Sequence, residues 1–363
     1  MFFEIINSLV AFIIVISLVV VTHEFGHYII AKLLGIQVTD FSVGLGPKLF
    51  GFKDKSGTHW KLCAIPLGGY IKFYGDADAG SVTSVKKDIS KSDYEKTFAK
   101  CSLWKRALVS VAGPMANFIT SIIILAVIFS FVGINLPNGT KITSVKEGSQ
   151  AEKAQLTTGD EIVAVNGKPT KTFNDLSEVF GTFKDSSMKV LINRDGKILE
   201  KTIVPQYFED AAGTSHMGQL GFSIAFTKQK MGFGESILRA TNFTFTLCVR
   251  ILMFLKEMLL GQGDTKDLRS IISITKQSGT MMKKGIFDIL FFIAIISINI
   301  GFINLLPIPP LDGGHILFCI VRGLCGERIA DVFEKYATVV GIFIVIGLML
   351  FGLVNDIIHF KSN

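Results

Sequence analysis

Two histidines and a glutamate occur together in the segment HEFGH at residues 23–27. On a helix, residues four apart share one face, so His23 and His27 can bind one metal ion. Glu24 lies beside the first histidine and can accept a proton from an attacking water molecule. With one further carboxylate ligand, such a site keeps an open coordination position, as catalytic zinc sites do. The spacing therefore predicts a hydrolytic metal centre.

The residues before this motif, VISLVVVT, are apolar enough to lie in a lipid bilayer. Histidine and glutamate are costly in that environment unless they are paired or functional. The position of the motif therefore strengthens the metal hypothesis. A third ligand must then come from another element that reaches the same depth in the membrane.

The composition of the 363-residue chain indicates a membrane protein. Charged residues make up 18% of it, against about 25% in soluble proteins. The net charge is +7, but no block of basic residues with interleaved aromatics occurs. A nucleic-acid partner is therefore disfavoured, and the basic excess suits membrane topology and anionic lipid. The five cysteines form no CxxC pair, which argues against a disulfide framework or a cysteine zinc site.

Four apolar segments, near residues 2–22, 103–132, 286–306 and 339–358, are long enough to span a bilayer, which takes about 20 residues. A fifth stretch, 237–260, is apolar but carries four charged residues, and we expect an amphipathic helix at the membrane interface. No Lys or Arg occurs before Lys32, which disfavours a cleaved signal peptide and places the end of the first segment on the cytoplasmic side.

Counting segments from that orientation places the first and third segments in the same direction, from outside to inside. Asp312 follows the inner end of the third segment, so it reaches the depth of His23 and His27. His315 lies at the same depth and stays open as a ligand. The segment NLLPIPPLDGGHI at 304–316 holds three prolines and two glycines, so it cannot remain a regular helix. Other carboxylates in apolar surroundings fall at the opposite face, namely Glu4, Asp288 and Asp356.

Two regions outside these segments are rich in strand-forming patterns. Residues 41–75 alternate as strands do and are dense in glycine. A short sheet there could offer an edge to an extended peptide, and an ordinary cytoplasmic hairpin is the alternative. Residues 140–206 hold short β-branched runs separated by Gly and Asp turns. Within them, GSQAEKAQLTTGDEIVAVNGKPT resembles the core of a PDZ domain, a peptide-binding module; a small β domain without a ligand is the alternative.

The order of these motifs carries a resemblance. HEFGH, then GPMANF at 113–118, the PDZ-like insert and NLLPIPPLDGG resemble the site-2 protease family of intramembrane zinc metalloproteases. The likeness covers nearly the whole chain and is greatest to the bacterial members that clip anti-sigma factors in regulated intramembrane proteolysis. It implies Zn2+ on His23, His27 and Asp312, with Glu24 as the general base.

The resemblance also implies where substrate binds. Residues 65–75 would hold the substrate as a strand, and Asn304 would contact its backbone. Within that segment we assign substrate binding to Gly68, Gly69, Tyr70 and Ile71. Asn117 in GPMANF matches a further family position, to which we assign a packing role. The segment LRSIISITKQSG at 268–279 departs from a GPIG-like stretch of the family, and a single PDZ-like domain stands where some members have two.

The expected fold class is an α-helical polytopic membrane protein with about four transmembrane helices, a membrane-associated β element and one extracytoplasmic PDZ-like α+β domain. The expected domains are residues 1–34 as transmembrane helix 1, 35–102 as the cytoplasmic-side loop with the β element, 103–133 as transmembrane helix 2, 134–206 as the PDZ-like domain, 207–285 as a linker with the amphipathic helix, 286–321 as transmembrane helix 3 with the LDG motif, and 322–363 as a loop and transmembrane helix 4.

We therefore expect a metalloprotease of the bacterial inner membrane, with its active site toward the cytoplasm. Its partners would be single-pass membrane-protein substrates (anti-sigma-factor-like proteins or signal-peptide remnants), the lipid bilayer and a possible peptide ligand of the PDZ-like domain, with no nucleic acid. Three rivals remain. A metal transporter or storage protein should show a polar path across the membrane, a silent PDZ-bearing scaffold would not need Glu24, and a protease of soluble substrates would not place HEFGH at the end of an apolar segment.

Overall fold

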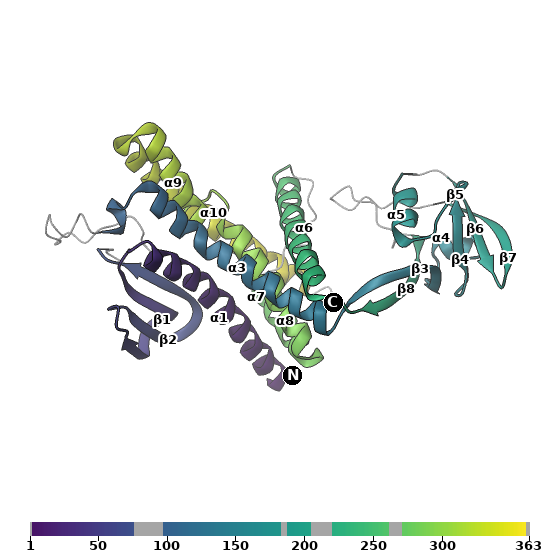
Figure 1. Cartoon of the computed structure of the whole chain (residues 1–363), viewed down its shortest axis with the longest axis horizontal. Helices are drawn as coiled ribbons and strands as arrows, with labels where there is room; N and C mark the ends of the chain where they lie inside the picture. The colour runs from purple at the N-terminus through teal and green to yellow at the C-terminus, as the bar shows by residue number, and fades with distance from the viewer. Residues whose placement is uncertain (1, 76–96, 183–186, 205–219, 261–270, 361–363) are drawn as a thin grey trace. The chain divides into compact units, whose positions relative to one another are not determined.

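The computed structural model describes residues 2–75, 97–182, 187–204, 220–260 and 271–360 (Figure 1). The chain forms two compact units. The helical unit comprises Met1–Ile128, Phe233–Ile251 and Thr265–Asn363, and the sheet unit comprises Phe129–Gly232 and Leu252–Asp264. Parts of several expected domains lie outside the described residues, namely 76–96 in the cytoplasmic-side loop, 183–186 and 205–206 in the PDZ-like domain, 207–219 and 261–270 in the linker, and 361–363 at the end of the last domain.

Apart from two short helices that accompany the sheet, the described helices are α1 (Phe2–Leu33), α3 (Leu103–Phe131), α6 (Phe233–Leu259), α7 (Ile271–Lys284), α8 (Ile286–Asn304), α9 (Asp312–Cys325) and α10 (Glu327–Phe360). A short 3-10 turn, η1, covers Phe98–Lys100. We expected transmembrane helix 3 over 286–321, with its regular helix broken in the proline-rich segment 304–316. The structure ends α8 at Asn304 and begins α9 at Asp312, because prolines interrupt the chain between them.

Five of the described helices are long and apolar enough to cross a membrane, namely α1, α3, α6, α8 and α10. This is one more than the four segments that we expected. The additional helix is α6, which covers the stretch that we assigned to the membrane interface. One of its charges, Arg239, pairs with Glu235 one turn away, and such pairing lowers the cost of charge near lipid. The helix content agrees with a multi-pass membrane protein.

Small residues allow α1, α3 and α8 to approach closely. A Cβ atom added to Gly26 in α1 would lie 2.3 Å from the carbonyl oxygen of Ala112 in α3. A Cβ atom on Gly301 in α8 would lie 3.1 Å from the carbonyl oxygen of Pro114. Close backbone contact of this kind is typical of helices that pack within membranes, and it makes α3 the element shared by the other two.

A bent pair of antiparallel strands, β1 (Val38–Lys53) and β2 (His59–Phe73), packs beside α1 (Figure 1). Residues 38–43 of β1 pair on one side with residues 59–62 of β2 and on the other with residues 69–73. The last arm of β2 therefore lies at the edge of this small sheet. No described strand pairs with the outer side of Gly69, Tyr70 and Ile71.

The sheet unit contains β3 (Ile134–Val145), β4 (Glu161–Val165), β5 (Lys168–Pro169), β6 (Met188–Arg194), β7 (Lys197–Ile203) and β8 (Phe222–Gln229), with the short helices α4 (Gln150–Lys153) and α5 (Phe173–Thr182). The strand order is β7-β6-β4-β3-β8, and β5 pairs with β4. We placed the end of this domain at residue 206, but β8 pairs with β3 and extends the sheet to Gln229. Fully buried aliphatic side chains such as Ile162, Leu176 and Ile192 form its core.

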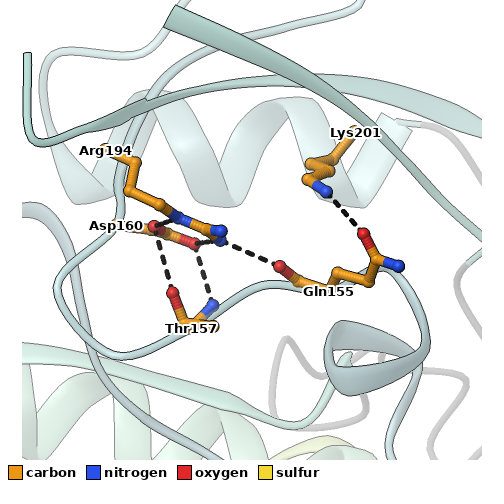
Figure 2. Close-up of polar contacts among 5 residues, drawn as sticks. All are labelled: Gln155, Thr157, Asp160, Arg194 and Lys201. Carbon is orange, nitrogen blue, oxygen red and sulfur yellow. Dashed lines mark hydrogen bonds and ion pairs between the residues drawn. The ribbon is translucent and has the colours of Figure 1, made fainter. Parts of the chain in front are cut away.

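A cluster of polar contacts joins the loop at residues 155–160 to strands β6 and β7 (Figure 2). The Asp160 carboxylate accepts hydrogen bonds from the guanidinium of Arg194 in β6 and from the amide of Thr157. Arg194 also donates to the carbonyl of Gln155, and Lys201 in β7 donates to the Gln155 side chain. These contacts give the buried Asp160 the partners that it needs.

Candidate metal centre

Helix α1 presents His23 and His27 on one face, one turn apart. Both residues are buried, with 8% and 6% of their surface exposed. Their Nε2 atoms lie 3.2 Å apart, so both point toward one place. The i, i+4 spacing on a continuous helix is what produces this convergence.

Asp312 reaches the same place from α9. It opens that helix directly after the proline-containing segment 305–311. Two glycines allow the segment to fold tightly. A Cβ atom on Gly313 would lie 2.2 Å from the carbonyl oxygen of Leu306, and a Cβ atom on Gly314 would lie 2.6 Å from the backbone nitrogen of Pro309. The break between α8 and α9 therefore sets the position of the aspartate.

His23, His27 and Asp312 form a group whose ligand atoms all lie within 4.8 Å of one another. Asp312 Oδ2 lies 3.0 Å from His23 Nε2, and Oδ1 lies 3.4 Å from His27 Nε2. Despite this proximity, Oδ2 is buried and forms no hydrogen bond with any described residue. Two imidazole nitrogens and a carboxylate are donors that zinc accepts, and the group fits such an ion.

The second ring nitrogen of His27 has a defined role. Nδ1 lies 2.7 Å from the carbonyl oxygen of Val109 in α3. A carbonyl can only accept, so Nδ1 must carry the hydrogen and a neutral His27 keeps its lone pair on Nε2. Metal-binding histidines commonly have such a partner, which fixes the ring and its tautomer.

A cavity of about 160 Å3 opens beside this group, far above the ~10–15 Å3 that one water molecule requires. Glu24 lines it, and the backbone amide of Ile71 donates a hydrogen bond to the Glu24 carboxylate. The edge strand of β2 lines the same cavity. Water, a carboxylate base and a strand edge can therefore meet at one site.

The residues predicted to bind substrate are distributed as follows. Gly69, Tyr70 and Ile71 line the cavity, whereas Gly68 is not among its lining residues. The side-chain amide nitrogen of Asn304, at the end of α8, lies 3.4 Å from His23 Nε2. Asn304 is thus placed at the edge of the three-residue group. His315 lines the cavity too, but it is not part of the group that could hold a metal among the described residues.

Two features of α3 were missed by sequence reasoning. The Val109 contact uses a backbone carbonyl, which has no side-chain signature. A Cβ atom on Gly113 would lie 2.3 Å from His27 Nε2 and 2.9 Å from His23 Cε1, so a glycine is needed where α3 crosses the histidines. The spacing of Ala112 and Ala116 on α3 could have indicated this close approach, since small residues four apart mark tight helix contacts.

Comparison with known proteins gives a consistent result. A family model described as peptidase family M50 matches residues 11–348. A protein of Rhizobium meliloti, provisionally named a zinc metalloprotease, is 35% identical over 95% of this chain and 95% of its own length. One from Clostridium acetobutylicum, named in the same way, is 31% identical over 99% and 98%. Metalloprotease MmpA of Caulobacter vibrioides is 30% identical over 96% and 95%.

Proposed function

This chain belongs to peptidase family M50 and is a metalloprotease, and from that premise we propose that it uses zinc to hydrolyse peptide bonds within transmembrane segments of single-pass membrane proteins. The observation that carries the proposal is that Asp312 meets His23 and His27 beside Glu24. The two histidines and Glu24 lie on α1, which is long and apolar enough to span a membrane. A buried group that can hold a metal, beside a carboxylate base and a cavity large enough for water, can supply the hydrolytic water that lipid excludes.

His23, His27 and Asp312 are the residues that would hold the ion. When bound, zinc supplies Lewis acidity, which polarises the scissile carbonyl and lowers the pKa of water. Two histidines and one carboxylate leave a coordination position open for the reaction. The three side chains come from α1 and α9, so their mutual position depends on the packing of both helices against their neighbours.

Glu24 is the proposed general base. Its carboxylate lines the cavity next to the metal-binding group, where it can take a proton from the attacking water. It would then return that proton to the nitrogen of the leaving amine. The hydrogen bond from the Ile71 amide holds the carboxylate toward the cavity. The same contact joins the base to the strand on which we propose that substrate is bound.

A transmembrane helix must unwind before one of its carbonyl groups can be attacked, because its backbone is fully hydrogen-bonded. Addition to the edge at Gly69, Tyr70 and Ile71 would restore part of that hydrogen bonding, as strand addition does in other peptide-binding proteins. Asn304 would contact the substrate backbone beside the metal. The edge lines the same cavity as Glu24, which supports the proposal that a bound strand would lie within reach of the base.

The physiological role follows from this chemistry. We propose that the chain acts in regulated intramembrane proteolysis, on anti-sigma-factor-like substrates or signal-peptide remnants, in the bacterial inner membrane. The sheet unit would then lie outside the cytoplasm, where a PDZ-like fold would admit shortened substrates or bind a peptide. The active site would face the cytoplasmic side.

The decisive experiment is co-expression of the chain with tagged single-pass membrane proteins. Glu24→Gln should abolish the shortened fragment while the purified protein still binds one zinc ion, because the ligands are intact. His23→Ala should lose both cleavage and zinc. Cleavage retained by Glu24→Gln would defeat the assignment of the base. Zinc binding without cleavage of any membrane protein by the wild type would favour a metal-storage or scaffold role.

A further inference from the structure

Asn117 is fully buried at the centre of the helical unit, with 0% of its surface exposed. It lies on α3, and its side-chain amide nitrogen is 3.2 Å from Nδ1 of His23. The amide oxygen, Oδ1, is buried and has no hydrogen-bond partner among the described residues. A buried side-chain amide lowers the stability of the folded state unless its N–H and C=O groups form hydrogen bonds. The contact with an imidazole therefore points to a role beyond packing.

The chemistry of His23 limits what that role can be. If Nε2 binds the metal, the neutral ring must carry its hydrogen on Nδ1. That N–H needs an acceptor, and an amide nitrogen cannot serve as one. The Asn117 amide has two orientations in which oxygen and nitrogen exchange places. Because Oδ1 makes no hydrogen bond with any described residue, no such bond is lost in the orientation that turns Oδ1 toward Nδ1.

We propose that Asn117 is a positioning residue that accepts a hydrogen bond from His23 Nδ1–H through Oδ1 and thereby holds the Nε2 lone pair toward the metal. The inference rests on the proposed zinc function. It gives His23 the same kind of support that the Val109 carbonyl gives His27. One helix, α3, then orients both imidazoles of the metal group.

The placement of these partners on α3 supports the proposal. Val109, Gly113 and Asn117 are four residues apart in succession, so they share one face of the helix. The first and last contact the two imidazoles, and the glycine between them gives the rings room. The main chain at Asn117 is itself anchored, because its carbonyl accepts hydrogen bonds from the hydroxyls of Ser121 and Ser297. Because two hydroxyls bond this carbonyl, removal of one of them leaves the main chain at Asn117 held by the other.

The test measures zinc affinity of the purified full-length protein in detergent, by competition with a chromophoric chelator. Asn117→Leu keeps the branched shape and the number of side-chain heavy atoms but removes the acceptor, and affinity should fall about 10- to 100-fold, as for the loss of other partners of metal-bound histidines. Asn117→Asp keeps an oxygen in either orientation and should remain within a few-fold of wild type. The matched control is Ser121→Ala, which loosens α3 at the Asn117 carbonyl without touching an imidazole, and it should also retain affinity.

A second readout follows the ligand geometry directly. Cobalt-substituted wild type and Asn117→Asp should share the same visible absorption bands, and Asn117→Leu should show altered bands. Thermal unfolding of the metal-free proteins separates this effect from misfolding. Unchanged zinc affinity in Asn117→Leu would overturn the proposal. So would an equal loss in Asn117→Asp or in Ser121→Ala, because each would show that packing rather than an acceptor is responsible.

The two proposals fail differently. If the wild-type protein bound no zinc, or if His23→Ala bound it as well as wild type, the proposed metal function itself would be wrong. If wild type bound zinc through His23 and only the Asn117 variants behaved unexpectedly, the positioning role alone would be rejected.

Discussion

At the scale of single residues, Asp160 shows how one carboxylate can make stability depend on pH. Burial raises the pKa of its carboxyl, but hydrogen bonds from Arg194 and Thr157 outweigh this effect and lower the pKa below its usual value. The folded state therefore holds this proton less tightly than the unfolded chain does. Its contribution to stability is present above the unfolded pKa of about 3.9 and is lost as the pH falls through the lower, folded pKa.

We therefore predict that the sheet unit loses stability as the pH falls below about 4, and that Asp160→Asn removes much of this dependence. At neutral pH the same substitution should lower the free energy of unfolding by about 2 kcal/mol, because it breaks charged hydrogen bonds of a buried group. Hydrogen exchange of β6 in the full-length protein, corrected for the intrinsic rate at each pH, measures both effects.

Glu200→Gln is the matched control for this prediction. Glu200 pairs with Lys189 across β6 and β7, but both side chains are more than half exposed, so solvent screens the pair and it contributes little to stability. A pH profile that Asp160→Asn leaves unchanged would show that another group is responsible for the acid sensitivity.

Residue types also determined how far the metal group could be anticipated. The histidines and Asp312 were found because imidazoles and carboxylates are conspicuous in apolar segments. The depth in the membrane that we inferred from the sequence could not show which of Asp312 and His315 is the ligand, because only three residues of chain separate them. The break before α9 separates them, because it places the first residue of that helix at the histidines.

At the scale of elements, the crossing of α1 and α3 sets the geometry of the site. We predict that Gly113→Ala lowers zinc affinity by at least about tenfold, comparable to the loss of a partner of a metal-bound histidine. The added Cβ would lie 2.3 Å from His27 Nε2, so the imidazole must leave its position. Helix propensity acts in the opposite direction, because alanine favours a helix over glycine by ~1 kcal/mol.

Gly347→Ala provides the control for this prediction. Gly347 also lies inside a helix, α10, but a Cβ atom there would meet no heavy atom within 4 Å. It should leave zinc binding unchanged in the same chelator competition. Equal zinc affinity in wild type and Gly113→Ala would show that the helices can separate without disturbing the ligands.

The elements differ in how well the sequence predicts them. Long apolar runs predict α1, α3 and α8 because a helix is the simplest way to satisfy backbone groups in lipid. Alternation and glycine content predicted a strand at the end of β2, but they did not predict which strand segments pair with it. The pairing of β8 with β3 joins segments about 80 residues apart in sequence, and single-sequence patterns carry no information on such pairs. The helix α6 covers the stretch that we assigned to the membrane interface because of its charges, and its length and apolar content also make it a candidate span.

At the scale of the whole molecule, the proposed orientation makes a direct prediction. In a variant without the five native cysteines, a cysteine at Lys168 in the sheet unit should react with an impermeant maleimide added to spheroplasts. A cysteine at Ser56, in the exposed turn between β1 and β2, should react only after the membrane is opened. Because cytoplasmic loops carry the excess of Lys and Arg, we expect this pattern. Labelling of Ser56→Cys from outside would reverse the topology and remove the basis for a cytoplasmic-side active site.

The separation of the metal-binding residues along the chain has a consequence for biosynthesis. His23 and His27 emerge from the ribosome early, whereas Asp312 belongs to the last helices to be made. During translation the nascent chain therefore carries two of the three proposed ligands before the third has been made. If these residues hold the ion as proposed, the group is complete only after nearly all of the chain has been made, so a nascent chain should not cleave peptide bonds before that stage.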